Sequence, residues 1–207
     1  MKRLFDIIIA SIALFLLSPI FILVAYKVRK NLGSPIFFYQ ERPGRGCKHF
    51  KMMKFRSMKN AFDENGNPLP DDQRITPFGH KLRSTSLDEM PQLINVLKGD
   101  MSVVGPRPQL PEFVEHYTPH QMRRHEVKPG MTGLAQVSGR NNLSWEEKFD
   151  LDVEYVEKQS LLFDFKIMFK TVEVMLKKEG IDSPDQAVGA SRFSGSNAPN
   201  STKNHHH

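Results

Sequence analysis

Residues 83–108 (RSTSLDEMPQLINVLKGDMSVVGPRP) place two adjacent acids among cations. Asp88 and Glu89 form this acid pair, Arg83 precedes it and Arg107 follows it. A carboxylate can attack phosphorus or hold a divalent metal, and cations offset the charge of phosphate oxygens. The combination of residue types therefore indicates phosphate chemistry.

The two acids must do different jobs if they lie on a helix. Consecutive side chains point about 100° apart at 3.6 residues per turn, so one acid can attack while the other binds metal or orients a partner. Glu89 has a structural alternative, because Ser86 and Glu89 have the spacing of a capping box, in which Glu89 would only satisfy a backbone N–H. The same spacing recurs at Ser144 and Glu147.

Arg107 lies between two prolines in the sequence GPRP of residues 105–108. The proline rings fix the local backbone, so the guanidinium is oriented at low entropic cost. Its planar fork suits bidentate contact with phosphate. A surface turn with an incidental arginine is the alternative interpretation.

Hydrophobic periodicity and turn residues predict the elements that must position these side chains. Their ranges are 75–97 (in two pieces), 145–157 and 164–178 for helices, and 36–39, 50–55 and 134–137 for strands. The last helix carries an apolar stripe that faces either the core or a membrane: Phe165, Met168, Phe169, Val172 and Leu176. We therefore expect a helix-rich α+β domain with short strands and amphipathic helices at an interface.

Residues 4–26 are apolar except for Asp6, Ser11, Ser18 and Pro19. Roughly 20 such residues span a bilayer. An internal proline removes a backbone donor and bends a helix, so Ser18 and Pro19 predict a kink, with Ser18 able to satisfy a freed backbone group. Cations at both ends favour the cytoplasmic face. We expect a kinked re-entrant membrane helix over residues 1–30, and an ordinary kinked transmembrane helix is the alternative.

The chain has 207 residues, a formal net charge of +6 and a single cysteine. One cysteine excludes an internal disulfide framework, and the length suits one domain with appendages. The positive balance suits nucleic acid, anionic lipid or phosphorylated small molecules without choosing among them. We expect a cytoplasmic catalytic domain over residues 31–185 and a flexible tail over 186–207, whose three final histidines we interpret as a purification-tag remnant.

Several blocks of the sequence resemble the small monotopic phosphoglycosyl transferases, a family of bacterial sugar transferases. The resemblance runs from about residue 2 to residue 180. Its blocks are Phe5 and Asp6 with Ser18 and Pro19, then QERPG (40–44), KFRSM (54–58), DQR (72–74), LRSTSLDEMPQL (82–93), GPRP (105–108), RH (124–125), KPGMTGLAQV (128–137), GRN (139–141), and Asp152 with Tyr155 and Asp164. It lacks the extra N-terminal membrane helices of larger members, so we expect the minimal catalytic form on the cytoplasmic face of a bacterial inner membrane.

The resemblance implies transfer of a sugar-1-phosphate from a UDP-sugar to undecaprenyl phosphate, with release of UMP, through a covalent aspartyl-phosphosugar intermediate. It implies that Asp88 is the nucleophile, that Glu89 assists, and that the acid pair holds Mg²⁺. It assigns phosphate or substrate binding to Arg83, Arg107, Lys54, Arg140, Asp152 and Asp164. It does not identify the sugar.

Two other functions stay open at this point. A membrane-tethered nucleic-acid-binding protein would interleave aromatic residues with cations, and residues 48–59 supply only Phe50 and Phe55. We therefore expect no nucleic-acid partner. A non-catalytic membrane scaffold would not need Asp88.

Overall fold

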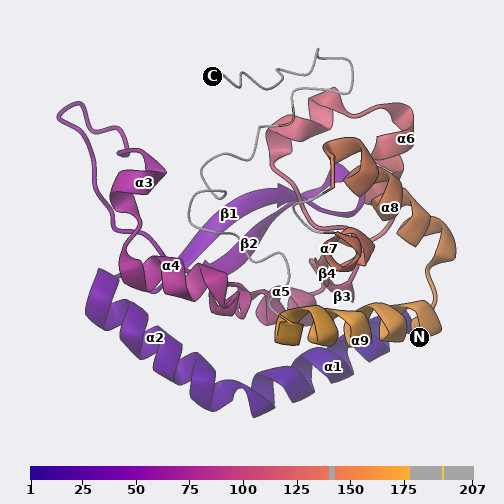
Figure 1. The fold of residues 1–207 in the computed structure, drawn as a ribbon, viewed down its shortest axis with the longest axis horizontal. Helices are drawn as coiled ribbons and strands as arrows, with labels where there is room; N and C mark the ends of the chain where they lie inside the picture. Colours follow the sequence, from indigo (N-terminus) through magenta and orange to yellow (C-terminus); the bar gives the residue numbers. More distant parts are fainter. Residues whose placement is uncertain (140–142, 178–192, 194–207) are drawn as a thin grey trace, which may run out of the picture.

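The computed structural model describes residues 1–139, 143–177 and 193 (Figure 1). In these residues the chain forms helices around two small sheets, which bears out a helix-rich α+β fold. The helices are α1 (Lys2–Leu16), α2 (Ser18–Leu32), α3 (Asp71–Arg74), α4 (Pro77–Ser84), α5 (Gln92–Lys98), α6 (Pro119–Met122), α7 (Leu134–Ser138), α8 (Trp145–Lys158) and α9 (Leu161–Lys177). The strands are β1 (Phe37–Pro43), β2 (His49–Phe55), β3 (Ser102–Val104) and β4 (Gly130–Thr132), and the 3₁₀ turns are η1 (Arg45–Cys47), η2 (Leu87–Glu89), η3 (Pro111–His116) and η4 (Arg123–Glu126).

Helices α1 and α2 form one bent pair, with a bend of 65° between them. Pro19 has no N–H to offer the carbonyl of Phe15, and the Ser18 hydroxyl donates to that carbonyl at 2.7 Å instead. The kink predicted at Ser18 and Pro19 is thus confirmed. Among the described residues no single helix is long and apolar enough to cross a bilayer, but the α1–α2 pair meets that requirement when taken together.

Strands β1 and β2 form an antiparallel hairpin in which Phe37 lies opposite Phe55 and Arg42 lies opposite Phe50. Both predicted strands are present, but β1 continues to Pro43, four residues beyond the end predicted at residue 39. The hairpin lies across the middle of the molecule, above the level of α4 and α5 (Figure 1).

The second sheet corrects the predicted strand over 134–137. Those residues form the helix α7, and the strand is β4, which pairs in parallel with β3. The reason is a close backbone approach that only glycine allows. A Cβ added at Gly130 would lie 2.1 Å from the backbone nitrogen of Gly105, so this pairing depends on contacts that lie far apart in the sequence.

The region around the acid pair is divided into three pieces rather than two. Helix α4 ends at Ser84, η2 carries Asp88 and Glu89, and α5 begins at Gln92 after Pro91. Ser86 has a φ of 54° and its side chain caps nothing among the described residues, so the capping box predicted at Ser86 and Glu89 is wrong. The capping box of Ser144 and Glu147 does form, at the start of α8.

Helix α1 is anchored to the domain by polar side chains on its inner face. Asp6 is 2% exposed, and its Oδ1 accepts hydrogen bonds from the Ser102 hydroxyl at 2.8 Å and from the Val103 N–H at 3.0 Å. Arg3 donates to the carbonyls of Val96 and Leu97 at the end of α5. These contacts hold the bent pair in a fixed position against the rest of the fold.

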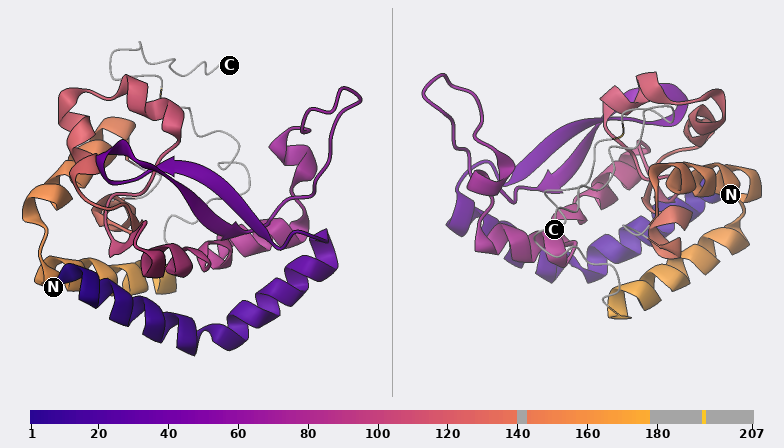
Figure 2. Two further views of the ribbon diagram at one scale, coloured as in Figure 1. Left: turned by 180° about the vertical axis from the view of Figure 1, so that it is seen from behind. Right: turned by 45° about the horizontal axis from the view of Figure 1, so that its top comes forward.

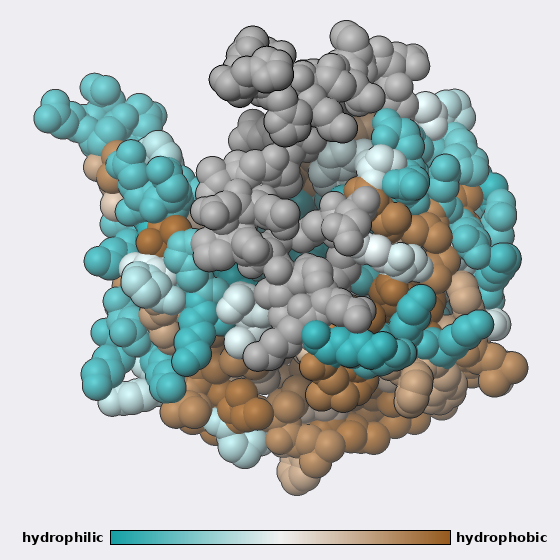
Figure 3. All heavy atoms as spheres, viewed as in Figure 1, coloured by the Kyte–Doolittle hydropathy of each residue, from teal (hydrophilic) through white to brown (hydrophobic). Residues whose placement is uncertain are grey.

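An apolar surface, which we call the apolar base, lies along the outer side of α1, the first half of α2 and α9 (Figure 3). On the bent pair its exposed residues include Ile8, Ile12, Phe15, Leu16, Ile20, Ile22 and Leu23. In Figure 2 the same three helices lie along one side of the molecule in a second view. Exposed residues of α9 include Phe165, Phe169, Val172 and Leu176, whereas Met168 packs on the core. The apolar stripe predicted on the last helix therefore faces outward for the most part, beside the bent pair.

Candidate active site

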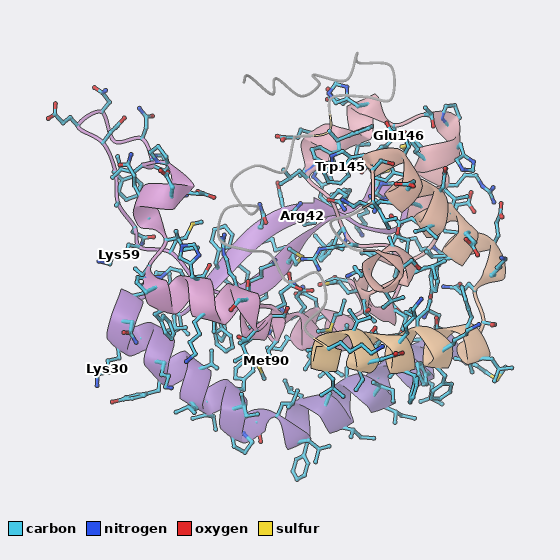
Figure 4. The ribbon with its side chains drawn as sticks, in the orientation of Figure 1. Lys30, Arg42, Lys59, Met90, Trp145 and Glu146 are labelled. Carbon is cyan, nitrogen blue, oxygen red and sulfur yellow. The ribbon has the colours of Figure 1, made fainter. Side chains whose placement is uncertain are left out.

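The acid pair lies on η2, between α4 and α5 and close to the apolar base. Its neighbours Leu87 and Met90 pack in one cluster with Val24 and Val28 of α2. Figure 4 shows Met90 in the layer between α5 and the α1–α2 pair. The acids are therefore held within two residues of side chains that touch the bent helix pair.

Glu89 is locked between two cations. Its Oε1 accepts hydrogen bonds from Lys54 Nζ at 2.8 Å and from Arg107 Nη2 at 2.5 Å, and its Oε2 accepts one from Arg107 Nη1 at 3.2 Å. Burial alone would raise the pKa of Glu89, but Arg107 and Lys54 hold it well below its usual range. Glu89 is thus a permanent anion that fixes both cations beside Asp88.

Asp88 contrasts with its neighbour. Its side chain is buried, with 7% of the residue exposed, and its carboxylate accepts no hydrogen bond from the described residues. Burial raises the pKa of Asp88 to about 6, and although the charge of Lys54 opposes this rise, the charge of Glu89 adds to it. Buried carboxylates nearly always have partners, so an unpartnered one is a candidate for chemistry.

Three of the cations expected from the sequence meet at the acid pair. Lys54 and Arg107 bind Glu89 directly, and Arg83 lies near enough for its charge to lower the pKa of Asp88. Arg83 is exposed, with its Nε donating to the Ser57 hydroxyl at 3.0 Å. A site with one reactive carboxylate and three neighbouring cations suits a phosphorylated substrate.

Arg107 is supported by Arg124, a residue of the resemblance to which no role was assigned from the sequence. Arg124 Nη2 donates to the Arg107 carbonyl at 2.6 Å and to Asp152 Oδ2 at 2.6 Å. The guanidinium of Arg124 also lies over the ring of Phe149, at 5.2 Å from its centroid. Among the described residues, Asp152 is thus linked to the site through Arg124: it binds the Arg124 guanidinium, which in turn binds the Arg107 carbonyl.

Asp164 is also buried away from the acid pair. Its Oδ2 pairs with Lys2 Nζ at 2.6 Å, and its Oδ1 accepts from the Tyr155 hydroxyl at 2.7 Å. These contacts join the beginnings of α1 and α9. The positions of Asp152 and Asp164 thus favour bracing over the substrate contact that the resemblance implies, and Arg140 lies outside the described residues.

His125 and Arg42 are further polar residues near the site, and the sequence analysis assigned a role to neither. His125 Nδ1 donates to the Gly44 carbonyl at 3.1 Å, and burial together with the charge of Arg124 lowers the pKa of His125 to about 4, so the ring is neutral. Arg42 lies on β1, in the block QERPG. The presence of Arg42 in this block of the resemblance was the sequence signal that could have identified it.

The described residues contain no group of three or more His, Cys, Asp and Glu side chains that could hold a metal ion. Within these residues, the carboxylates that a metal ion could use at this site are those of Asp88 and Glu89. The acid pair offers one carboxylate without a partner and one already shared by two cations.

A comparison with protein families finds a match between residues 1–178 and the model of the bacterial sugar transferase family. The chain is 50% identical over 196 residues to the uncharacterized sugar transferase EpsL of Bacillus subtilis, with 95% of this chain and 96% of EpsL covered. It is 39% identical over 196 residues to the exopolysaccharide production protein ExoY of Rhizobium meliloti, with 86% and 87% covered. It is 41% identical over 197 residues to the undecaprenyl-phosphate galactose phosphotransferase of Salmonella typhimurium, with 87% of this chain but 41% of that protein covered.

Proposed function

Because the chain belongs to the bacterial sugar transferase family, we propose that it moves a sugar-1-phosphate from a UDP-sugar to undecaprenyl phosphate. The products are undecaprenyl-diphosphate-sugar and UMP. The observation that carries this proposal is the asymmetry of the acid pair. Glu89 is held by Lys54 and Arg107, whereas the buried carboxylate of Asp88 has no hydrogen-bond partner in the described part of the chain.

In the first step, a carboxylate oxygen of Asp88 attacks the phosphorus that bears the sugar. A bond forms between that phosphorus and Asp88, and the bond to the bridging oxygen of the diphosphate breaks, so UMP leaves with the electron pair. Two features support Asp88 in this role. Its raised pKa makes it more basic than an ordinary carboxylate, and the cations around it offset the charge of the phosphate oxygens.

In the second step, a phosphate oxygen of the lipid attacks the same phosphorus. The new diphosphate bond forms and the bond to Asp88 breaks, which returns Asp88 as a carboxylate. Attacking and leaving oxygens lie roughly in line in phosphoryl transfer, so the attacking oxygen of the lipid phosphate must approach the phosphorus from the side on which UMP left. The two steps balance without any further reactant.

The acid pair fits a Mg²⁺ ion only in the presence of substrate. Mg²⁺ is commonly held by one or two carboxylates together with substrate phosphates and water, so the lack of a three-carboxylate cluster in the described residues suits such a site. Asp88 and Glu89 would hold the ion, which when bound would offset charge on the phosphate oxygens. The chain's own part is to keep Glu89 ionised and Arg107 in place, as the contacts of both residues indicate.

We also infer that the α1–α2 pair enters the cytoplasmic leaflet of the bacterial inner membrane and returns. The 65° bend, the exposed apolar base and the cations at both ends of the pair support this topology. The packing of Leu87 and Met90 on α2 supports a position of Asp88 near the lipid headgroups. A lipid phosphate confined to the interface could then reach it.

The reaction is tested by incubating the full-length protein in detergent with Mg²⁺ and a panel of UDP-sugars. One donor should release UMP before any lipid is added, in an amount near that of the enzyme, and lipid-linked sugar should form once undecaprenyl phosphate is supplied. Lipid product without the early UMP would argue against a covalent intermediate. A protein that makes no lipid product with any donor would favour the scaffold alternative.

A further inference from the structure

A polar cavity lies beside the acid pair, on the side of Lys54 and Arg107. Its volume is about 60 Å³, and a single water needs roughly 10–15 Å³, so it has room for a small polar group. The lining residues are Arg42, Met52, Lys54, Gln92, Arg107, Pro108 and Gln109. Three of these are cations, and neither Asp88 nor Arg83 is among them.

Arg42 is the cation of this cavity that the proposed reaction has not used. It is half-buried, its Nη2 donates to the uncharged Gln40 Oε1 at 2.7 Å, and its buried Nε has no partner among the described residues. Burial lowers the pKa of Arg42 to about 10, and the charge of Arg107 adds to this effect, whereas the charges of Glu89 and Glu112 oppose it. A bound anion would further offset the cost of holding this buried cation beside Arg107.

Gln92 supplies a second polar group that lacks a partner. Only 3% of this residue is exposed, it lines the cavity, and its side-chain amide makes no hydrogen bond with the described residues. Buried amides are normally hydrogen-bonded. Two independent side chains, one from β1 and one from α5, thus line the same cavity and keep hydrogen-bonding capacity that the described residues do not use.

The hairpin determines how far Arg42 stands from the reacting acid. Gln40 pairs with Met52 and Phe38 pairs with Lys54, so Arg42, Gln40, Met52 and Lys54 share one face of the ribbon. At about 3.3 Å per residue, the four-residue separation of Phe38 and Arg42 places the backbone of Arg42 roughly 13 Å further along than that of Lys54. Figure 4 shows Arg42 on the hairpin, well removed from the α1–α2 pair.

We propose that this cavity is the subsite for the phosphate of UMP, and that Arg42 is its dedicated cation. The inference rests on the proposed function, in which two phosphates of the donor must be held at once. The phosphorus attacked by Asp88 lies next to the acid pair, so the phosphate that leaves with uridine extends past Glu89 and Arg107 into the cavity. Arg42 and the Gln92 amide then donate to its oxygens, and the charge of Arg42 is offset when the phosphate binds.

The test compares UMP with uridine, because these ligands differ only in the phosphate. Their dissociation constants are measured by ligand-observed NMR on the full-length protein in detergent, at pH 8. In the wild type UMP should bind more tightly than uridine. Arg42→Gln should reduce that preference by about tenfold or more, while the affinity for uridine stays the same. Arg45→Gln, which removes an exposed arginine from η1 of the same hairpin, should leave the preference unchanged.

The outcomes separate the inference from the function on which it rests. An unchanged preference in Arg42→Gln, or a wild type that does not distinguish UMP from uridine, overturns the assignment of Arg42. Equal losses of UMP and uridine affinity would reveal a general disturbance of the fold and would overturn it as well. A wild type that makes no lipid-linked sugar from any donor defeats the proposed function, whatever the ratio of the two dissociation constants.

Discussion

The buried carboxylates of this protein fall into two groups with opposite surroundings. The first is the acid pair on η2. The second, which we call the frame aspartates, consists of Asp6, Asp152 and Asp164. Each frame aspartate accepts hydrogen bonds from groups on other elements, such as Ser102, Arg124 and Tyr155. Asp88 is buried nearly as deeply and accepts none from the described residues.

The frame aspartates stabilise the fold through their hydrogen bonds, whereas Asp88 is buried by the fold without any from the described residues. A buried charge is tolerated when hydrogen bonds and an opposite charge satisfy it, as they do at Asp152. Asp88 has nearby cations but no direct partner, so its ionisation works against folding, and the pKa shift records that cost. Stability alone does not account for such a residue, whereas the proposed attack on a substrate phosphorus would.

The largest expected effect concerns activity at Asp88. Asp88→Asn removes the attacking oxygen while preserving shape, and loss of a nucleophile commonly costs at least about a thousandfold in rate. The initial rate of lipid-linked product formation measures it. Asp152→Asn should lose far less activity per folded molecule. Equal losses in the two variants would contradict the different roles assigned to Asp88 and the frame aspartates.

The next effect concerns stability at a frame aspartate. Asp152→Asn leaves the buried charge of Arg124 without its counter-ion, which costs about 3–5 kcal/mol. For a chain of this size, the Tm should fall by roughly 2–4 °C per kcal/mol. Asp150→Asn is the control, because Asp150 is exposed on the same helix and its Tm should barely change. A Tm for Asp152→Asn equal to that of the wild type would contradict the bracing role.

The third prediction concerns the sign of a stability change: replacing a frame aspartate should destabilise the protein, whereas replacing Asp88 should stabilise it. The folded-state pKa of Asp88 is raised from 3.8 to about 6, so its ionisation destabilises the fold; this cost is absent below about pH 4, grows towards pH 6 and is complete above it. Asp88→Asn should therefore be more stable than the wild type at pH 8 by about 3 kcal/mol, and about equal at pH 4. Thermal denaturation in EDTA measures this, and a destabilised variant at pH 8 would show that Asp88 belongs with the frame aspartates.

The smallest effect concerns the helix break. Ser18→Ala leaves the Phe15 carbonyl without its donor, which costs about 1 kcal/mol. Ser11→Ala is the matched control, since Ser11 is exposed on α1 and its hydroxyl makes no hydrogen bond with the described residues. Thermal denaturation of both variants in detergent should show a lower Tm for Ser18→Ala alone. Equal Tm values would mean that the hydroxyl does not stabilise the kink.

Features that depend on neighbouring residues could be predicted from the sequence. The kink at Ser18 and Pro19 and the two strands of the β1–β2 hairpin follow from local patterns. The capping box at Ser86 failed because Lys54 and Arg107 compete for the carboxylate of Glu89, and neither is near it in sequence. At Ser144 and Glu147, which have the same spacing, the Glu147 carboxylate accepts from the Ser144 N–H and the capping box forms.

Features that depend on distant partners could not be predicted. Asp6 meets Ser102 across 96 residues, and Asp152 meets Arg124 across 28, so no local pattern could show that these acids are internal supports. The tail expected over 186–207 lies outside the described residues except for Phe193. That residue is 6% exposed and packs in one cluster with Phe113 and Phe149.

The central claim is that Asp88 captures a phosphorylated sugar, and mass spectrometry of the intact and digested protein tests it most directly. The wild type is mixed with its UDP-sugar and Mg²⁺, without lipid acceptor, and quenched. We expect a mass increase of one sugar-phosphate group, located on the peptide that contains Asp88 and lost when undecaprenyl phosphate is added. An adduct on Glu89 or any other side chain, or an Asp88→Asn variant that carries the same label, would contradict the account.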